Sequence, residues 1–330
     1  MAPNVDHYNR KVTYLRISVT DRCNLRCMYC QPVKNLRLLD HTDILTYEEI
    51  LKIVEAATQV GINKVRLTGG EPLLRSNFVH FAACLCRISG LNEVSITTNG
   101  VLLKKKAKEI FDAGVRRINV SLDTLNPLKY AKITGRQCFE DVWGGLEAAE
   151  TVGFSPIKLN VVAIRGFNDN EFLRFAELSV RKPYHVRFIE YMPIGPDSHW
   201  TPEKYLSSDE IKFKLESFGP LLKIPRSTSD GPAERYRFES ARGEIGFISA
   251  LSHHFCPSCN RLRLLADGKL RPCLFSDEEV DIKTALKSGC SQEDIKELFR
   301  KTIASKPERH HAEMLKEGAE LLHPMSAIGG

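Results

Sequence analysis

Apolar and polar stretches alternate regularly along the first two-thirds of this chain of 330 residues. Short runs rich in Val, Ile and Leu predict strands, and the longer amphipathic stretches between them predict helices. The six expected strands lie at 13–20, 64–70, 93–100, 116–123, 157–164 and 185–192. A strand–helix order that repeats in this way implies a parallel sheet with right-handed crossovers.

The helix boundaries support this division. Thr46 and Glu49 have the spacing of a capping box, and the helix that they open is expected to stop at Gly61. Ser76 is expected to cap a helix that runs through Ile88. Six β/α units are two short of a closed eight-stranded barrel, so they fit a partial (β/α)6 TIM-type barrel. A doubly wound open sheet has the same pattern and is the alternative.

The pattern changes near Gly195, where IGPDSHWTPEKY predicts a loop. Short helical stretches follow, with one further strand at 243–251 and two C-terminal helices. We therefore expect two domains, a partial barrel over 1–195 and an α+β domain over 196–330 that ends in a Gly-Gly tail.

Composition narrows the class of protein. Hydrophobic residues make up 42% of the chain and charged residues 27%, as in soluble globular proteins. No apolar run is long enough to span a membrane, and the N-terminus has no signal-peptide pattern, so a cytoplasmic protein without a membrane partner is expected. The net charge of +6 is a mild bias toward anionic ligands. No stripe of cations and aromatic residues indicates a nucleic-acid partner.

Six of the ten cysteines fall into two groups of three. The stretch DRCNLRCMYC has the spacing C-x3-C-x2-C, and CPSCNRLRLLADGKLRPC has the spacing C-x2-C-x13-C. Structural zinc sites close with four ligands, whereas a [4Fe–4S] cluster held by three thiolates keeps one iron open for another ligand. The two groups are Cys23, Cys27 and Cys30, and Cys256, Cys259 and Cys273.

The second group leaves an alternative open, because His253 and His254 precede it and could complete a zinc site. Cys84 and Cys86 lie in an apolar helical run, where small buried thiols are expected. No role is assigned to these two cysteines, nor to Cys138 and Cys290.

Polar and glycine-rich segments follow the predicted strands. GGEP follows the second strand, Thr97–Gly100 the third, Ser121–Asp123 ends the fourth, and Met192 ends the sixth. The carboxyl ends of parallel strands carry the ligand chemistry of such folds, so these segments are expected to line one cavity with the first cysteine group.

Charged residues recur on the strands themselves. Arg16 shares a strand face with Ser18, and Lys64 shares one with Arg66. Further cations lie at Lys158, Arg187, Arg261 and Arg263. Because unpaired charges are costly inside a sheet, these residues predict an anion within the barrel. For Lys64 alone, a side chain that reaches solvent is the alternative.

The motif CNLRCMYC followed by LTGGEP resembles the radical S-adenosylmethionine (SAM) superfamily, whose members use the partial barrel. FCPSCNRLRLLADGKLRPCLF, VRFIEYMPIG, LTGGEPLLR and the terminal Gly-Gly are together similar to the GTP 3′,8-cyclase family, molybdenum cofactor biosynthesis protein A, from about Tyr14 to Gly330. The resemblance implies a lyase that uses a SAM-derived radical to remove the ribose 3′ hydrogen of GTP. C3′ then joins C8, and the product is 3′,8-cyclo-7,8-dihydro-GTP.

The resemblance also implies two [4Fe–4S] clusters and SAM as cofactors, with the first cysteine group holding the SAM cluster and the second holding the substrate-side cluster. SAM-contact positions match Tyr29, Gly70, Ser121 and Met192. GTP-contact positions match Arg16, Lys64, Arg66, Thr97, Lys158, Arg187, Arg261, Leu262 and Arg263, and the tail Gly329-Gly330 is expected to reach the same site. Arg16, Arg261 and Arg263 are the expected catalytic residues.

The implied partners are an electron donor and cyclic pyranopterin monophosphate synthase as the downstream enzyme, and the family permits a homodimer. Two other functions remain open from the sequence. One is a radical SAM enzyme that modifies a peptide and carries an auxiliary cluster. The other is a zinc-stabilised binding module without catalysis.

Overall fold

The structure is a computed structural model of the chain, and it describes residues 3–30, 38–195, 199–225, 231–310 and 324–329. The strands are β1 (Tyr14–Ser18), β2 (Lys64–Thr68), β3 (Glu93–Thr98), β4 (Arg117–Ser121), β5 (Ile157–Ala163), β6 (Tyr184–Glu190), β7 (Leu221–Lys223), β8 (Glu234–Phe238), β9 (Glu244–Ile248), β10 (Arg261–Leu264), β11 (Lys269–Arg271) and β12 (Val280–Asp281). The helices are α1 (Tyr47–Val60), α2 (Phe78–Cys86), α3 (Leu103–Asp112), α4 (Pro127–Thr134), α5 (Phe139–Val152), α6 (Phe172–Arg181), α7 (Ser208–Glu216), α8 (Ile282–Lys287), α9 (Gln292–Ala304) and α11 (Met325–Ile328).

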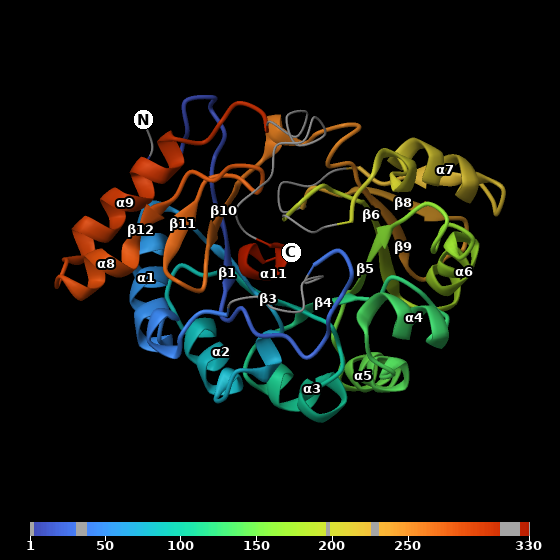
Figure 1. Cartoon of the computed structure of the whole chain (residues 1–330), viewed down its shortest axis with the longest axis horizontal. Helices are drawn as coiled ribbons and strands as arrows, with labels where there is room; N and C mark the ends of the chain where they lie inside the picture. Colours follow the sequence, from blue (N-terminus) through green and yellow to red (C-terminus); the bar gives the residue numbers. More distant parts are fainter. Residues whose placement is uncertain (1–2, 31–37, 196–198, 226–230, 311–323, 330) are drawn as a thin grey trace.

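All these strands belong to one curved sheet with the order β12-β11-β10-β1-β2-β3-β4-β5-β6-β9-β8-β7. Strands β1 to β6 are consecutive and parallel, which confirms the predicted α/β pattern. Their order has no reversal, and a reversal is what defines a doubly wound sheet. Helices α1 to α6 lie along the outer side of the curve (Figure 1).

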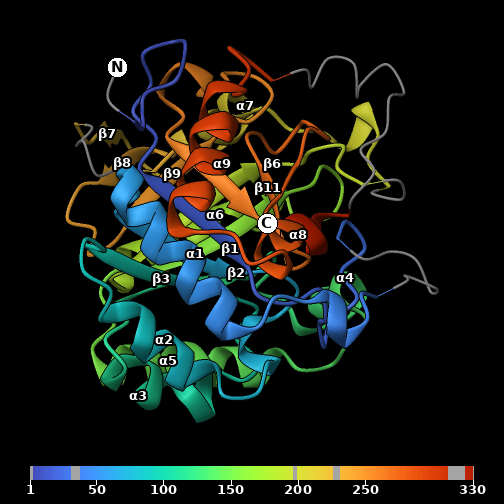
Figure 2. The same cartoon turned by 90° about the vertical axis from the view of Figure 1, so that its left-hand side faces the viewer.

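The C-terminal part extends both edges of this sheet. β10 pairs in parallel with β1, and β9 pairs in parallel with β6. Helix α9 packs along α1 on the outside (Figure 2). The division into two domains at residue 195 stays a prediction, and the strands that follow it continue the sheet of the first part. Within the described ranges, no helix is both long and apolar enough to cross a membrane.

The two faces of the sheet differ in chemistry. Leu15 and Ile17 point outward and are fully buried against the helices. Arg16 is in register with Arg66 on one side and with Arg263 on the other. Residues directly paired across strands point to the same face, so these three guanidinium groups face the inside of the curve.

The sequence signals for helix ends are confirmed at both ends of α1, but the one at the start of α2 is wrong. Thr46 and Glu49 form the expected capping box, and Gly61 ends α1 with φ 111°, a conformation that favours glycine. The expected cap at Ser76 is wrong. Helix α2 begins at Phe78 after Asn77, whose φ of 59° follows the short 3-10 turn Pro72–Leu74. Asn tolerates this left-handed conformation, which the turn requires.

The two cysteines of α2 are less buried than expected. Both side chains are partly exposed. Cys86 packs against the main core, while the Cys84 sulfur lies 3.7 Å from His80 Nε2 on the same helix.

Candidate active site

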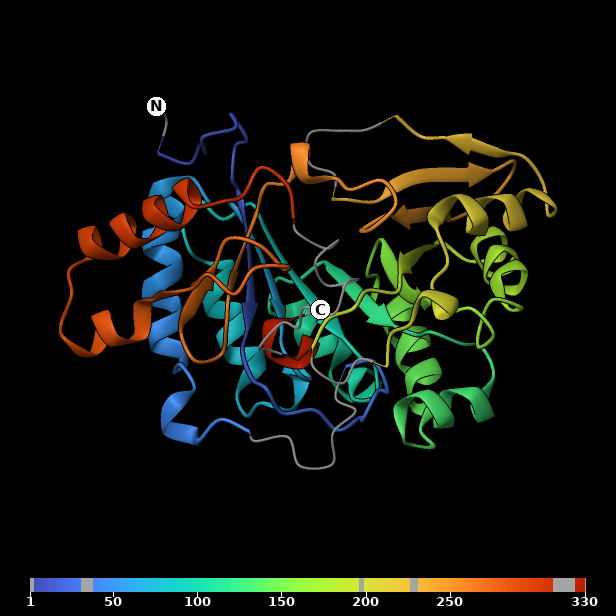
Figure 3. The ribbon, with the colours of Figure 1, turned by 45° about the horizontal axis from the view of Figure 1, so that its top comes forward.

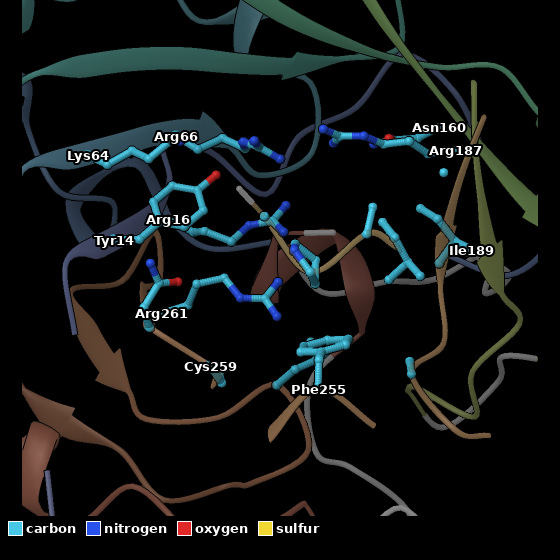
Figure 4. A pocket seen from close by; sticks show the side chains of 18 of the residues that line it. Tyr14, Arg16, Lys64, Arg66, Asn160, Arg187, Ile189, Phe255, Cys259 and Arg261 are labelled. Carbon is cyan, nitrogen blue, oxygen red and sulfur yellow. The ribbon is translucent and has the colours of Figure 1, made fainter. Parts of the chain in front are cut away.

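A cavity of about 840 Å³ lies inside the curve of the sheet (Figure 4). Among the residues that the structure describes, its lining contains ten Lys and Arg side chains but only two carboxylates, Glu93 and Glu244. Arg66 and Arg187 extend toward each other across the cavity, and Arg16 and Arg261 enter it from the same side as Arg66, from the neighbouring strands β1 and β10. The ten cations are Lys11, Arg16, Lys64, Arg66, Arg117, Lys158, Arg187, Arg235, Arg261 and Arg263. The cavity is therefore built for an anion.

The structure brings together all seven of the cations singled out in the sequence, since each of them lines this cavity. Thr97 lies on β3 and is buried, but it is not part of the lining. The Leu262 side chain is fully buried in the apolar core, on the opposite face of β10 from Arg261 and Arg263. Any contact of Leu262 with a ligand would therefore involve its backbone. Gly330 lies outside the described residues.

Burial, and then the charges of neighbouring cations, lower the pKa values of four of these side chains. Burial, followed by the charges of Arg263 and Arg66, lowers the pKa of Arg16 well below its usual value. Burial and Arg66 lower the pKa of Arg187 to about 9, and burial and Arg261 do the same for Arg263. Burial, Arg187 and Arg66 lower the pKa of Lys158 to about 6. An anion in the cavity would offset these repulsions.

Short contacts fix several of the cations in place. Arg187 Nη1 donates to Asn119 Oδ1 at 3.2 Å, and Arg66 Nε donates to Ser95 Oγ at 3.4 Å. The alternative for Lys64 was a side chain that reaches solvent. Instead, its Nζ lies 3.0 Å from a Glu93 carboxylate oxygen.

Several polar atoms inside the barrel are buried and have no hydrogen-bond partner within the described part of the chain: Tyr14 Oη, Ser18 Oγ, Thr97 Oγ1 and Asn160 Oδ1. Such atoms are costly unless a ligand satisfies them, so they mark the interior as a polar ligand site. The sequence analysis missed Tyr14 and Asn160, which both line the cavity. Strand alternation was the available signal, because each lies two residues from a predicted contact, Arg16 or Lys158.

The first cysteine group lies in the loop after β1, outside the lining of this cavity. Backbone amides of Arg26 and Met28 donate to carbonyls at the end of α4, at 2.8 and 2.9 Å, and hold the loop against the barrel. Burial raises the pKa of Cys27 well above its usual value, and Cys30 and Cys23 contribute in the same direction. The three thiols therefore lie close enough to interact, as ligands of one cluster must.

The strand-end segments gather around this loop. A Cβ added to Gly70 would lie 2.2 Å from the Arg22 carbonyl oxygen, so only glycine allows the GGEP segment to approach so closely. Asn99 Nδ2 donates to Asn24 Oδ1 at 2.8 Å, and Tyr29 Oη donates to Asp123 at 2.6 Å. Of the strand-end residues expected to line one cavity, only Met192 lines the cation-rich cavity.

Two buried carboxyl groups belong to the same region and were not assigned from the sequence. Glu71 is fully buried and accepts hydrogen bonds from Thr98 Oγ1 and the Asn99 amide, at 2.8 and 2.6 Å. Burial raises the pKa of Glu71 to about 7 and that of Asp123 to about 6. Their position at the ends of β2 and β4 is the sequence feature that could have identified them as site residues.

The second cysteine group does line the cation-rich cavity. Cys256 begins the 3-10 turn Cys256–Ser258, and the Cys259 amide donates to the Cys256 carbonyl at 3.1 Å. Burial raises the pKa of Cys256, with smaller contributions from Cys273 and Cys259, so these thiols also interact. In the part of the chain that the structure describes, no three His, Cys, Asp or Glu side chains converge on a single metal ion.

The histidines of the zinc alternative have other contacts. His253 Nε2 lies 2.7 Å from Asp209 Oδ2, and the His254 ring packs edge-on against His310.

The C-terminal tail occupies the middle of the barrel, where Figure 3 shows the chain end among the strands. Helix α11 leads to Gly329, and Arg263 Nη1 donates to the carbonyls of Ile328 and Gly329. A Cβ added to Gly329 would lie 2.5 Å from Thr68 Cγ2 and 2.7 Å from Ser18 Oγ. Gly329 therefore packs against the side chains that end β1 and β2, in a space that a larger residue would not fit.

Comparison with known proteins agrees with this geometry. Residues 17–179 match the radical SAM superfamily, and residues 184–312 match Molybdenum Cofactor Synthesis C. The GTP 3′,8-cyclase of Thermodesulfovibrio yellowstonii is 50% identical over 98% of this chain and 99% of its own length. That of Desulforamulus reducens is 46% identical over 99% and 100%.

Among solved structures, Streptococcus suis SuiB bound to its precursor peptide SuiA aligns with a TM-score of 0.66 at 14% identity, over 97% of this chain and 77% of that one. SuiB bound to S-adenosylmethionine aligns with a TM-score of 0.65 at 14% identity, over 94% and 76%. At this identity the likeness shows the fold alone.

The barrel and the three-cysteine loop at the end of its first strand define a radical SAM protein, and that class carries a [4Fe–4S] cluster and uses SAM. Its near full-length relatives narrow the assignment. The chain belongs to the GTP 3′,8-cyclase family of molybdenum cofactor biosynthesis. This membership favours the cyclase over the peptide-modifying alternative.

Proposed function

We propose that this protein converts GTP to 3′,8-cyclo-7,8-dihydro-GTP as a radical SAM lyase. One observation carries the proposal: a single cavity contains both the crowded cations and the second cysteine group. A triphosphate needs several cations, and arginine forks match phosphate oxygens in pairs. The same cavity leaves the purine and ribose within reach of Cys256, Cys259 and Cys273.

The substrate roles follow from position in the cavity. Arg66 and Arg187 face each other across the cavity and would hold phosphate oxygens together with Lys158, which lines the same cavity, and Lys64. Thr97 and the backbone of Leu262 would complete the polar contacts. Arg16, Arg261 and Arg263 are the proposed catalytic residues, because they lie between the phosphate cations and the second cysteine group. Arg261 also lies over the Phe255 ring, 4.7 Å from its centroid, which fixes its guanidinium plane.

The other roles concern the radical side of the barrel. Cys23, Cys27 and Cys30 would hold the SAM cluster, and Tyr29, Gly70, Ser121 and Met192 would contact SAM. When bound, the cluster and SAM supply the radical that removes the ribose hydrogen. The Gly329-Gly330 tail, anchored by Arg263, would separate the two sides and exclude water from the radical.

The second cysteine group would hold a second [4Fe–4S] cluster whose open iron meets the purine. We further propose that the protein works in the cytoplasm, receives electrons from a separate donor and supplies cyclic pyranopterin monophosphate synthase. A homodimer and the two-domain division at residue 195 belong to the same proposal.

The test is an anaerobic assay with reconstituted protein, SAM and a strong reductant. GTP, ATP or no nucleotide is added, and 5′-deoxyadenosine and cyclised nucleotide are quantified. We expect both products to form in about equal amounts with GTP only. SAM cleavage that does not depend on GTP would show that the substrate belongs to another class of molecule, such as a peptide. No cleavage by iron-loaded protein would contradict the radical reaction.

A further inference from the structure

Lys306 is a buried lysine whose contacts all lie at the second cysteine group. It follows α9 and is only 3% exposed. Its Nζ donates to the carbonyls of Arg261 at 2.9 Å and Pro272 at 2.8 Å, and it lies 3.8 Å from the Cys259 sulfur. These three contacts use the three N–H donors of an ammonium group. Pro272 directly precedes Cys273, so Lys306 joins the two chain segments that carry Cys259 and Cys273.

The charge of Lys306 has no counter-ion of the usual kind. Among the residues with described positions, no Asp or Glu carboxylate pairs with it. A buried ammonium is costly unless an anion compensates it. The Cys259 sulfur lies 3.8 Å from Nζ, so a thiolate of the second cysteine group is the anion in reach to compensate this charge.

Arg10 offers a contrast on the other side of the same group. Its Nη1 donates to the Cys256 carbonyl at 3.0 Å and to the Glu308 carbonyl at 3.0 Å, and Nη2 donates to the Pro307 carbonyl at 2.7 Å. Arg10 has its own carboxylate, because Nε lies 2.6 Å from Asp6. It therefore fixes the segment that follows Lys306 without leaving a charge for the thiolates to compensate.

We propose that Lys306 is a positioning residue of the second iron–sulfur site: it holds the Cys259 and Cys273 segments together and stabilises the reduced state of the bound cluster. This inference rests on the second cluster of the proposed function. Adding an electron to a cluster adds negative charge, which a nearby buried cation and an N–H donor to a ligand sulfur stabilise. Loss of the ammonium should therefore make the second cluster harder to reduce.

The experiment isolates the second cluster by using the full chain with Cys23→Ala, Cys27→Ala and Cys30→Ala. In this parent, Lys306→Met, Lys306→Arg and the control Lys301→Met are reconstituted anaerobically; Lys301 is exposed on α9. Iron and sulfide per chain are measured, and a redox titration is followed by electron paramagnetic resonance. We expect Lys306→Met to shift the redox equilibrium about tenfold toward the oxidised cluster. For a one-electron couple, this shift lowers the reduction potential of the cluster by about 59 mV.

Lys306→Arg keeps the charge and the donors, so it should titrate close to the parent, as should Lys301→Met. Loss of the cluster in Lys306→Met with retention in Lys306→Arg would also support the proposal. A normal cluster at the parent's potential in Lys306→Met would overturn it, and so would equal shifts in the Met and Arg variants. A parent without iron would overturn the second cluster itself, and the role of Lys306 with it.

Discussion

The two cysteine groups share a ligand count but lie in opposite electrostatic surroundings. Around the first group, the buried ionisable groups include the carboxyls Glu71 and Asp123. Around the second, they are cations, among them Arg263 and Lys306. SAM carries a positive sulfonium and an amino group, whereas GTP carries a triphosphate. Under the proposed function, the charge of the surrounding groups, rather than the thiol set, therefore distinguishes the SAM site from the GTP site.

The largest expected effect separates the two groups outright. Cys27→Ala removes a ligand of the first cluster, so SAM cleavage should fall at least 100-fold, to the background level, because the radical source is lost. Iron per chain should fall by about half, since the second group is intact. The measurements are 5′-deoxyadenosine formation and iron content in anaerobic protein. If the Cys27→Ala variant cleaved SAM at the unaltered rate, Cys27 would not be a ligand of the first cluster.

Arg263→Ala should damage the second site alone. Truncating one charged hydrogen-bond partner costs about 1.5–3 kcal/mol, so GTP turnover should fall about 100-fold. Both clusters should remain, because Arg263 is not a ligand. Steady-state product formation and iron content are compared with Arg300→Ala, which alters a partly exposed arginine on α9 that pairs with Glu293 and Glu297. Normal turnover in Arg263→Ala would disprove its assigned role.

Glu71 should make the first region sensitive to pH. Its pKa in the fold, about 7, is above the unfolded value of 4.5, so the folded protein binds more protons than the unfolded chain between these values. Stability should therefore fall as pH rises, by roughly 2 kcal/mol between pH 5.5 and 7 at 1.36 kcal/mol per pKa unit. Glu71→Gln should flatten this dependence in denaturant titrations of the apo protein, while Glu109→Gln on the exposed face of α3 should retain it.

Lys158 should couple GTP binding in the cationic region to the uptake of a proton. With a pKa of about 6 it is mostly neutral at pH 7.5, and a bound triphosphate favours its ammonium form, so binding takes up a proton. GTP affinity should fall about tenfold from pH 6 to 8, a range in which Arg187 and Arg263 stay charged because their pKa values are about 9.

Calorimetry in two buffers of different ionisation enthalpy measures the proton uptake at Lys158. Lys158→Met should abolish it, and Lys105→Met, which alters an exposed lysine of α3, should not. If Lys158→Met took up as many protons on GTP binding as the unaltered protein, another group would be responsible for the uptake.

Much of the fold was accessible from local pattern. The strands β1 to β6 and the capping box of α1 follow from alternation and from spacing, because both depend on neighbours within a few residues. The start of α2 was not accessible in this way, since the turn before it sets the conformation of Asn77. Thr97 and Leu262 show the same limit within the candidate site: neither side chain lines the cavity.

The sequence by itself determined that two three-thiol groups exist and that cations alternate with apolar residues on the strands. These properties depend on spacing along the chain, which the covalent order sets. Only the tertiary structure decided that Arg16, Arg66 and Arg263 share one register row, and that Lys306 meets Cys259 across 47 residues. Such contacts depend on the pairing of strands and on the packing of α9 against the barrel. Both arise between residues far apart in the chain, so no local sequence pattern encodes them.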